Sequence, residues 1–529
     1  MRNLEHPGRS PVHATGAMAA TSNPLATSTA LNVLQDGGNA VDAAVAACAV
    51  QCVVEPQSTG IGGDCFVLLA PGGGELVAFN GSGPAPAAAT AAWYRDHGIE
   101  VIARHSPHSV TVPGAVDAWW QLLRDYGSRD LGALLRPAIG FAREGYPIHS
   151  RVAFDWALAA ELLRQDPTAA RIFLPDGRAP RAGALHRQPD LAATLERIAE
   201  HGRDGFYSGP VAEDIVAYLQ SLGGLHSLED FAGVSGEYVT PIKTAYRDYE
   251  VYECPPNGQG IIALEMLNIL SGLLTGMADP LSAERLHFEI EAARLSYRDR
   301  DDLIGDPRQA EVPVALLLSA AHAAKRRAAI QPARAMAAPP PSQVPAHADT
   351  VYLCVVDRER TAVSFINSLF NSFGSGLVSP RTGVTLQNRG ECFVTGPDHP
   401  NCIAPRKRPL HTLMPGMLVQ DGRAVMPFGV TGGHYQAIGH AHFLTNVLDF
   451  GLDLQEAIDL PRVFPLPGGP VEVESGVPRD SVDGLRKLGH RIARPAKPVG
   501  GGQAIRIDWQ SGVLTGASES RKDGCALGY

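Results

Sequence analysis

Thr350 carries a hydroxyl that could act as a nucleophile, and it lies at the junction of two different kinds of sequence. An Ala- and Pro-rich stretch ends just before it, and the apolar run 351–356 follows it. If the bond between Asp349 and Thr350 were cut, the new α-amine of Thr350 could act as the base for its own hydroxyl. An α-amine has a pKa of about 8, near the value that a general base needs at neutral pH. Taken alone, the stretch fits an ordinary threonine at the start of a strand better.

The residues around Thr350 predict a buried β-hairpin. Residues 351–356 and 361–366 are rich in β-branched and apolar side chains, and the polar residues 357–360 join them. Both faces of the first strand are apolar, which indicates burial on both sides. Residues 325–348 are biased toward Ala and Pro without periodicity, so we expect a mobile tether over 330–349.

The N-terminal half predicts elements that would support such a hairpin. Residues 27–54 have apolar residues at helical spacing, interrupted by Gly37-Gly38, which predicts two helices joined at a glycine C-cap. A glycine-rich turn at 60–64 leads into a strand at 65–69, with a partner strand at 76–80. The glycines lack the order of a dinucleotide-binding loop. Trp119 and Trp120 lie at core spacing on a helix that opens after 112–114.

Composition excludes several classes of function. The 529 residues carry a net charge of -10 and no basic stripe, so we expect neither nucleic acid nor a membrane surface as a partner. The length allows one large domain or two smaller ones. Residues 1–17 lack the apolar core of a secretory signal, and the eight cysteines are scattered, which together predict a cytoplasmic protein with reduced thiols.

We expect no metal and no cofactor. His434, His440 and His442 lie close in sequence, but a metal site needs ligands in a defined geometry, and this spacing does not supply one. Gly374-Ser375-Gly376 is not the nucleophile elbow of α/β-hydrolases. A turn beneath the active site is the simpler interpretation of these glycines.

Motifs along nearly the whole chain resemble the γ-glutamyltransferase (glutathione hydrolase) family. They occur in the order and spacing of that family. In the C-terminal part they are Asp349-Thr350-Val351, Val355-Val356-Asp357, Phe373-Gly374-Ser375-Gly376, Thr382-Gly383, Arg408-Pro409-Leu410 and Thr431-Gly432-Gly433. In the N-terminal part they are Asp36-Gly37-Gly38-Asn39-Ala40-Val41-Asp42-Ala43-Ala44, Gly60-Ile61-Gly62-Gly63-Asp64, Val112-Pro113-Gly114 and Gly305-Asp306-Pro307.

The resemblance implies an N-terminal nucleophile hydrolase, an α+β protein built as a four-layer αββα sandwich. It implies cleavage after Asp349 into a large subunit, 1–349, and a small subunit, 350–529, which fold as one unit. It also implies that Thr350 is the nucleophile and that Ser368 orients it. The backbone N–H groups of Gly432 and Gly433 would form the oxyanion hole.

The acyl-binding positions depart from the family. In γ-glutamyl enzymes an arginine and two serines bind the substrate α-carboxylate, and an asparagine, a glutamine and an aspartate hold the α-ammonium. The matching positions here are Asn80, His411, Thr412, Phe370, Arg389 and Cys392. An ammonium would lack its anion beside Arg389, at a cost of several kcal/mol, unless Glu391 turned inward. We therefore expect an anionic acyl group, bound by Arg389 with His411 or Thr412.

Three functions stay open at this point. Residues 363–366, 387–390 and 409–413 resemble the oxamate amidohydrolase branch, which predicts hydrolysis of a small carboxylate-bearing amide, with glutaryl-type acylases as neighbours. A γ-glutamyltransferase with a rebuilt pocket is the second function, and a non-processing ligand-binding relative is the third. The expected partners are a small-molecule amide and the two subunits of one precursor. A homo-oligomer of the processed unit is left open.

Overall fold

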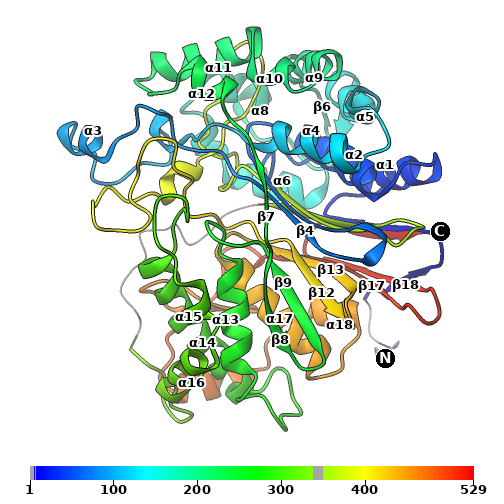
Figure 1. Cartoon of the computed structure of the whole chain (residues 1–529), viewed down its shortest axis with the longest axis vertical. Coiled ribbons are helices and arrows are strands. Elements are labelled where there is room, and N and C mark those ends of the chain that lie inside the picture. The colour runs from blue at the N-terminus through cyan, green and yellow to red at the C-terminus, as the bar shows by residue number, and fades with distance from the viewer. Residues whose placement is uncertain (1–4, 6–7, 338–349) are drawn as a thin grey trace.

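The computed structural model describes residues 5, 8–337 and 350–529, and in this part the chain forms four layers (Figure 1). Two seven-stranded antiparallel sheets lie face to face between two layers of helices. The expected αββα sandwich is therefore confirmed. Among the described residues, no helix is long and apolar enough to cross a bilayer.

The first sheet contains the predicted hairpin at its centre. Its strands follow in the order β19 (Cys525–Gly528), β2 (Met18–Thr21), β10 (Val351–Val356), β11 (Ala362–Ser368), β3 (Asp64–Ala70), β4 (Val77–Gly81) and β7 (Glu237–Val239). Every residue of β10 and β11 is buried. Val351 pairs with Asn367 and Val356 with Ala362, so the hairpin and its burial on both faces are confirmed.

The second sheet packs against the first across an apolar core. Its order is β1 (Val12–Ala14), β18 (Leu514–Ser518), β17 (Gly501–Ile507), β13 (Arg423–Thr431), β12 (Gly416–Gln420), β9 (Tyr249–Glu253) and β8 (Ile242–Tyr246). Gly429 lies where a Cβ would stand 2.4 Å from the Tyr352 ring, so glycine lets the sheets approach there. Residues before and after 350 supply strands to both sheets, so separating the two parts would expose apolar sheet faces.

Helices cover the outer face of each sheet. On the first sheet lie α1 (Pro24–Gln35) and α2 (Ala40–Val54), and α2 packs directly on β10 and β11. The helix α5 (Leu131–Glu144) packs on α2. The predicted break in 27–54 is confirmed, since Gly37 has a φ of +84° and Asn39 caps α2. On the second sheet lie α13 (Gly260–Leu270) and α17 (Tyr435–Leu448), and α14 (Ala283–Leu303) packs on both of these helices.

Shorter elements complete the layers. The remaining helices are α3 (Ala91–Asp96), α4 (Ala115–Tyr126), α6 (Ser150–Leu158), α7 (Ala160–Leu163), α8 (Pro167–Phe173), α9 (Pro189–His201), α10 (Asp204–Tyr207), α11 (Pro210–Ser221), α12 (Leu228–Ala232), α15 (Val314–Leu317), α16 (Ala320–Ala329), α18 (Leu454–Asp459) and α19 (Arg479–Lys487). Small sheets pair β5 (Tyr146–Pro147) with β6 (Leu185–His186), and β15 (Val471–Val473) with β14 (Val463–Pro465) and β16 (Ile492–Ala493).

Two expectations were wrong. Residues 325–329 belong to α16, because alanine is the strongest helix former and Ser319 caps the helix. In the expected tether, Ile330 is buried and the Met336 amide donates to Glu291, whereas residues 331–334 and 337 are exposed. Residues 338–349 lie outside the described residues, so the tether over 330–349 stays a prediction. Trp119 is buried as expected, but Trp120 is 38% exposed.

Candidate active site

Thr350 lies buried at the head of β10, beside the end of β11. Its Oγ1 is 3.1 Å from the Oγ of Ser368. The amide of Phe370 donates to the Ser368 Oγ at 2.8 Å, which fixes the position of this hydroxyl beside Thr350. The structure therefore brings these two hydroxyls together, while Asp349 lies outside the described residues.

The glycine-rich turn at 60–63 makes this juxtaposition sterically possible. Ser368 pairs with Asp64 across β11 and β3. A Cβ on Gly63 would stand 2.2 Å from the Ser368 carbonyl oxygen, and a Cβ on Gly62 would stand 2.2 Å from the Thr385 carbonyl oxygen. The turn thus holds the end of β11 by close backbone contact, which only glycine permits.

Gly432 and Gly433 follow the end of β13 and have φ values of +117° and +59°, which glycine adopts without strain. The Gln259 side-chain amide donates to the Gly433 carbonyl at 3.0 Å and to the Thr412 carbonyl at 3.3 Å. Arg300 donates to the other end of Gln259 at 3.2 Å. Gln259 therefore ties the glycine pair to the backbone of Thr412, a role that sequence reasoning missed. Its place in a Pro- and Gly-rich turn before α13 was the available signal.

Arg389 is a fully buried cation in the expected acyl pocket. Its Nη1 donates to the Thr412 Oγ1 at 2.8 Å, and its guanidinium carbon lies 4.1 Å from the centre of the Phe370 ring. Burial lowers the pKa of Arg389 to about 10, against the opposing influence of Cys392 and Asp64. Its Nε and Nη2 atoms have no hydrogen-bond partner among the described residues. Two unsatisfied N–H groups on a buried guanidinium are suited to a carboxylate.

His411 and Asp64 form a buried pair behind this pocket. The His411 Nε2 lies 3.0 Å from a carboxylate oxygen of Asp64, and the Leu413 amide donates to His411 Nδ1 at 3.2 Å. Burial lowers the pKa of His411 well below its usual value, with Arg389 as the next cause. Both ring nitrogens of His411 are therefore bonded within the protein, and its expected role as a substrate ligand stays a prediction.

Sequence reasoning missed Asp64 as a functional residue, although it ends the Gly60–Asp64 motif. Its carboxylate accepts hydrogen bonds from the Gln387 side chain at 2.9 Å and from the Gly83 and Gly114 amides at 2.9 and 3.1 Å. Burial raises the pKa of Asp64 to about 6, while the Arg389 charge and these donors lower it. An acid at the start of a strand, directly after a glycine turn, was the available signal.

The other expected pocket residues divide into two groups. Cys392 lies beside Arg389 and is buried, which raises the pKa of its thiol to about 12. Asn80 instead donates to Asn257 at 2.9 Å and accepts from the Ser82 amide at 3.0 Å, so its side chain is already occupied. Glu391 accepts from the Asn371 side chain at 3.0 Å, so its carboxylate already has a hydrogen-bond partner.

The three close histidines bond to different partners. Arg300 contacts His434, Glu253 contacts His440 at 2.6 Å, and Glu289 contacts His442 at 3.0 Å. Among the described residues, two other groups place ligand atoms within 4.8 Å of one another. The first is His287, Glu291 and His490, all buried, and the second is Glu265, Asp299 and the partly exposed His322. Arg294 and Arg326 pair with carboxylates of these groups, which disfavours a further cation.

Comparison with known proteins places this site in context. A family model described as gamma-glutamyltranspeptidase matches residues 26–529. The chain is 36% identical over 523 residues to the glutathione hydrolase-like YwrD proenzyme of Bacillus subtilis (strain 168), covering 97% of this chain and 98% of that protein. It is 36% identical over 536 residues to the oxamate amidohydrolase proenzyme of Klebsiella pneumoniae, covering 97% and 99%. The solved structure of a cephalosporin acylase from Bacillus halodurans matches with a TM-score of 0.92 at 39% identity, covering 100% and 99%.

Proposed function

This chain belongs to the γ-glutamyltranspeptidase family of amide hydrolases with an N-terminal nucleophile, and we propose that it hydrolyses a small amide whose acyl group ends in a carboxylate, as in oxamate. The nucleophile would be Thr350, freed by cleavage after Asp349. Relatives named as proenzymes support the cleavage of one precursor into two subunits.

The observation that carries the proposal is the unsatisfied guanidinium of Arg389. A buried cation without an ionic hydrogen-bond partner is costly, and a bound carboxylate would supply the missing acceptors. Nε and Nη2 both lack partners among the described residues, so two acceptor oxygens are needed. A planar carboxylate offers two oxygens in a geometry that matches the arginine fork.

The same pocket argues against an acyl group that carries an ammonium. Phe370 presents an aromatic ring to Arg389, and the Cys392 thiol stays protonated because burial raises its pKa. Glu391 is held by Asn371. An ammonium here would be buried near a guanidinium, and the nearby carboxylates of Asp64 and Glu391 are already bonded to His411 and Asn371. This favours oxalyl-type or glutaryl-type acyl groups over γ-glutamyl groups.

Each step of the proposed reaction uses a group described above. The Thr350 hydroxyl first attacks the Asp349 carbonyl, its own amide nitrogen leaves, and water hydrolyses the resulting ester, which frees the α-amine. That amine then takes the proton of the Thr350 hydroxyl as the oxygen attacks the substrate carbonyl. The Gly432 and Gly433 amides would stabilise the oxyanion. The leaving nitrogen receives the proton, and water releases the acid from the ester.

A panel of amides tests the proposal on processed protein. We would compare oxamate, glutaryl-4-nitroanilide, γ-glutamyl-4-nitroanilide and the uncharged butyryl-4-nitroanilide. We expect turnover of oxamate, of glutaryl-4-nitroanilide or of both. We expect weak turnover of the γ-glutamyl and butyryl anilides. Strong turnover of the γ-glutamyl anilide alone would contradict the proposal and would support a γ-glutamyltransferase with a rebuilt pocket.

A further inference from the structure

The loop at 370–376, directly after β11, has a strained backbone. Phe370 and Phe373 have φ values of +81° and +57°, in the left-handed region that residues with bulky side chains rarely adopt. Gly374 and Gly376 lie in the same region, at +55° and +75°. Strained residues persist only where the surrounding structure imposes their conformation, and they cluster at functional sites. The contacts that impose this conformation therefore bear on function.

Phe370 connects the two halves of the candidate site. Its amide donates to the Ser368 Oγ at 2.8 Å, and this hydroxyl lies 3.1 Å from the Oγ1 of Thr350. Its ring covers one face of Arg389, with the guanidinium carbon 4.1 Å from the ring centre. A shift of Phe370 would therefore displace the orienting hydroxyl and the pocket cation together.

Two neighbouring side chains from the N-terminal part of the chain bond the carbonyls of this loop. Arg104 donates from Nε to the Gly374 carbonyl at 3.0 Å and from Nη2 to the Ser372 carbonyl. His105 donates from Nδ1 to the Ser375 carbonyl at 2.8 Å, since a carbonyl can only accept. The planar guanidinium thus bonds two carbonyls along one edge, a geometry that a single ammonium cannot reproduce.

The same segment also packs behind Arg389. The short turn η2 (Pro107–Ser109) closes back onto Arg104, whose carbonyl accepts from the Ser109 hydroxyl at 2.7 Å. A Cβ on Gly390 would stand 2.9 Å from two carbonyl oxygens of this turn, so glycine permits a close backbone contact there. Residues 104–109, the bracket, therefore contact both loops that form the acyl pocket.

We propose that Arg104 is a positioning residue for the acyl pocket and that it acts through Phe370 on Arg389 and Ser368. The bracket precedes the expected cleavage site and the loop follows it, so cleavage would make this a contact between the two subunits. The inference rests on the proposed function in one respect, because it assumes that Arg389 binds the acyl carboxylate. It makes selectivity for an anionic acyl group depend on a residue outside the pocket.

Steady-state kinetics of processed Arg104→Met would test this role. The substrate would be whichever anionic acyl amide the wild type hydrolyses, oxamate or glutaryl-4-nitroanilide. We expect its KM to rise about tenfold, because Arg389 loses its fixed orientation, while kcat/KM for the uncharged butyryl-4-nitroanilide falls by less. A merely structural role would reduce the amount of active enzyme and leave KM unchanged, and that result would overturn the inference.

Arg104→Lys separates the guanidinium fork from its charge. Burial raises the pKa of Glu391, against the Asn388 hydrogen bond and the Arg104 charge, so Arg104 also acts on this carboxylate electrostatically. Lysine keeps the charge but cannot bond both carbonyls as a fork, so we expect the raised KM to persist. A wild-type KM in Arg104→Lys would show that the charge alone is needed and would overturn the inference.

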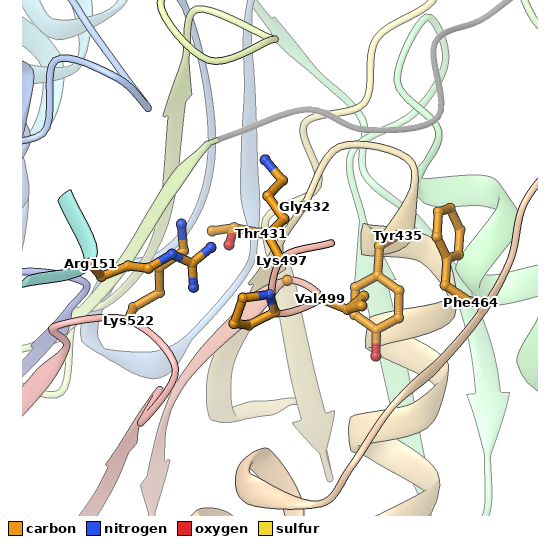
Figure 2. Close-up of a pocket in the computed structure, with 10 residues that line it drawn as sticks. Arg151, Thr431, Gly432, Tyr435, Phe464, Lys497, Val499 and Lys522 are labelled. Atoms are coloured by element: carbon orange, nitrogen blue, oxygen red, sulfur yellow. The ribbon is translucent and has the colours of Figure 1, made fainter. Parts of the chain in front are cut away.

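Arg151 supplies a matched comparison at another contact between the two parts of the chain. Arg151 and Thr431 line one small recess (Figure 2), and the Arg151 side chain donates to the Arg521 carbonyl at 2.7 Å. Arg151→Met should lower stability and leave the KM for the anionic amide unchanged, and the exposed Arg95→Met should match the wild type. An equal rise in KM for Arg151→Met would show that loosening the two parts anywhere has this effect, and would overturn the inference.

Hydrogen–deuterium exchange tests the bracket without substrate, on processed and on uncut protein alike. The amides of Phe370, Phe373 and Ser375 all donate hydrogen bonds. In Arg104→Met we expect peptides covering 369–377 to exchange at least about tenfold faster, with the β10–β11 hairpin unchanged. Unchanged exchange at 369–377 would overturn the inference and leave the proposed function intact. Faster exchange there, with no anionic amide hydrolysed by the wild type, would overturn only the proposed function.

Discussion

The imidazole of His411 donates from Nε2 to Asp64 across 3.0 Å, although the two residues are 347 positions apart in the chain. The Leu413 amide occupies Nδ1, which fixes the tautomer and keeps the ring neutral. The titrating member of this pair is therefore Asp64, which is close enough to Arg389 for each charge to shift the other's pKa. The pair sets the charge of the acyl pocket.

Asp64→Asn should change the pH dependence of substrate binding. Burial raises the pKa of Asp64 to about 6, so its carboxyl gains a negative charge as pH rises through that value. The new charge opposes a substrate carboxylate at Arg389, so the KM for oxamate should rise by up to about tenfold, or about 1.4 kcal/mol, from about pH 5 to about pH 8. In Asp64→Asn the KM should be flat. The exposed control Asp248→Asn should follow the wild type, and parallel profiles for all three proteins would refute the assignment.

Thr350→Ala should give a single uncut chain without amidase activity. The variant lacks the hydroxyl needed for both chain cleavage and substrate attack, so we expect kcat to fall by at least about 10³-fold. Gel electrophoresis and mass spectrometry would measure the cleavage. Thr350→Ser keeps a hydroxyl and should still be processed, more slowly. A new N-terminus at position 350 in the alanine variant would rule out the assigned role.

Ser368→Ala should slow both processing and turnover, because it removes the hydroxyl 3.1 Å from Thr350 Oγ1. The loss of one buried hydrogen bond corresponds to a fall in kcat of about tenfold. Ser368→Thr restores the hydroxyl and should recover most of the rate. Equal rates for the alanine and threonine variants would show that Ser368 does not orient the nucleophile.

Local sequence patterns predicted the parts of the fold that depend on neighbouring residues. The β10–β11 hairpin and the break between α1 and α2 follow from the spacing of apolar residues and from the turn residues between them. Both features are present. Arg389, Thr412 and Phe370 occupy positions that bind the acyl group in γ-glutamyl enzymes. The three residues lie in contact here, as the resemblance implied. Contacts between distant segments, such as Gln259 with Gly433, left no local pattern to detect. The Ala bias of residues 325–329 was interpreted as irregular chain, but alanine is the strongest helix former and these residues end α16.

Arg389→Met should separate binding from folding. Methionine fills the space without charge, so we expect the KM for oxamate to rise by about 10- to 100-fold while processing continues. The free energy of unfolding should stay the same or increase, because a buried and incompletely paired charge is removed. Steady-state kinetics and urea unfolding at one pH would measure the two effects. An unchanged KM would eliminate Arg389 as the carboxylate ligand.

Gln259→Leu should lower kcat more than it raises KM. Gln259 does not belong to the Arg389 pocket, but its amide fixes the Gly433 and Thr412 carbonyls at 3.0 and 3.3 Å. Without it the glycine pair loses a fixed orientation, and misplaced oxyanion donors cost about 10- to 1,000-fold in kcat. Gln259→Glu is the sharper test, since a carboxylate can still accept from Arg300 but cannot donate to the two carbonyls. We expect both variants to fold, to process slowly and to lose kcat, whereas the exposed control Gln309→Leu should match the wild type. A wild-type kcat in Gln259→Glu would show that the glycine pair keeps its geometry without this residue.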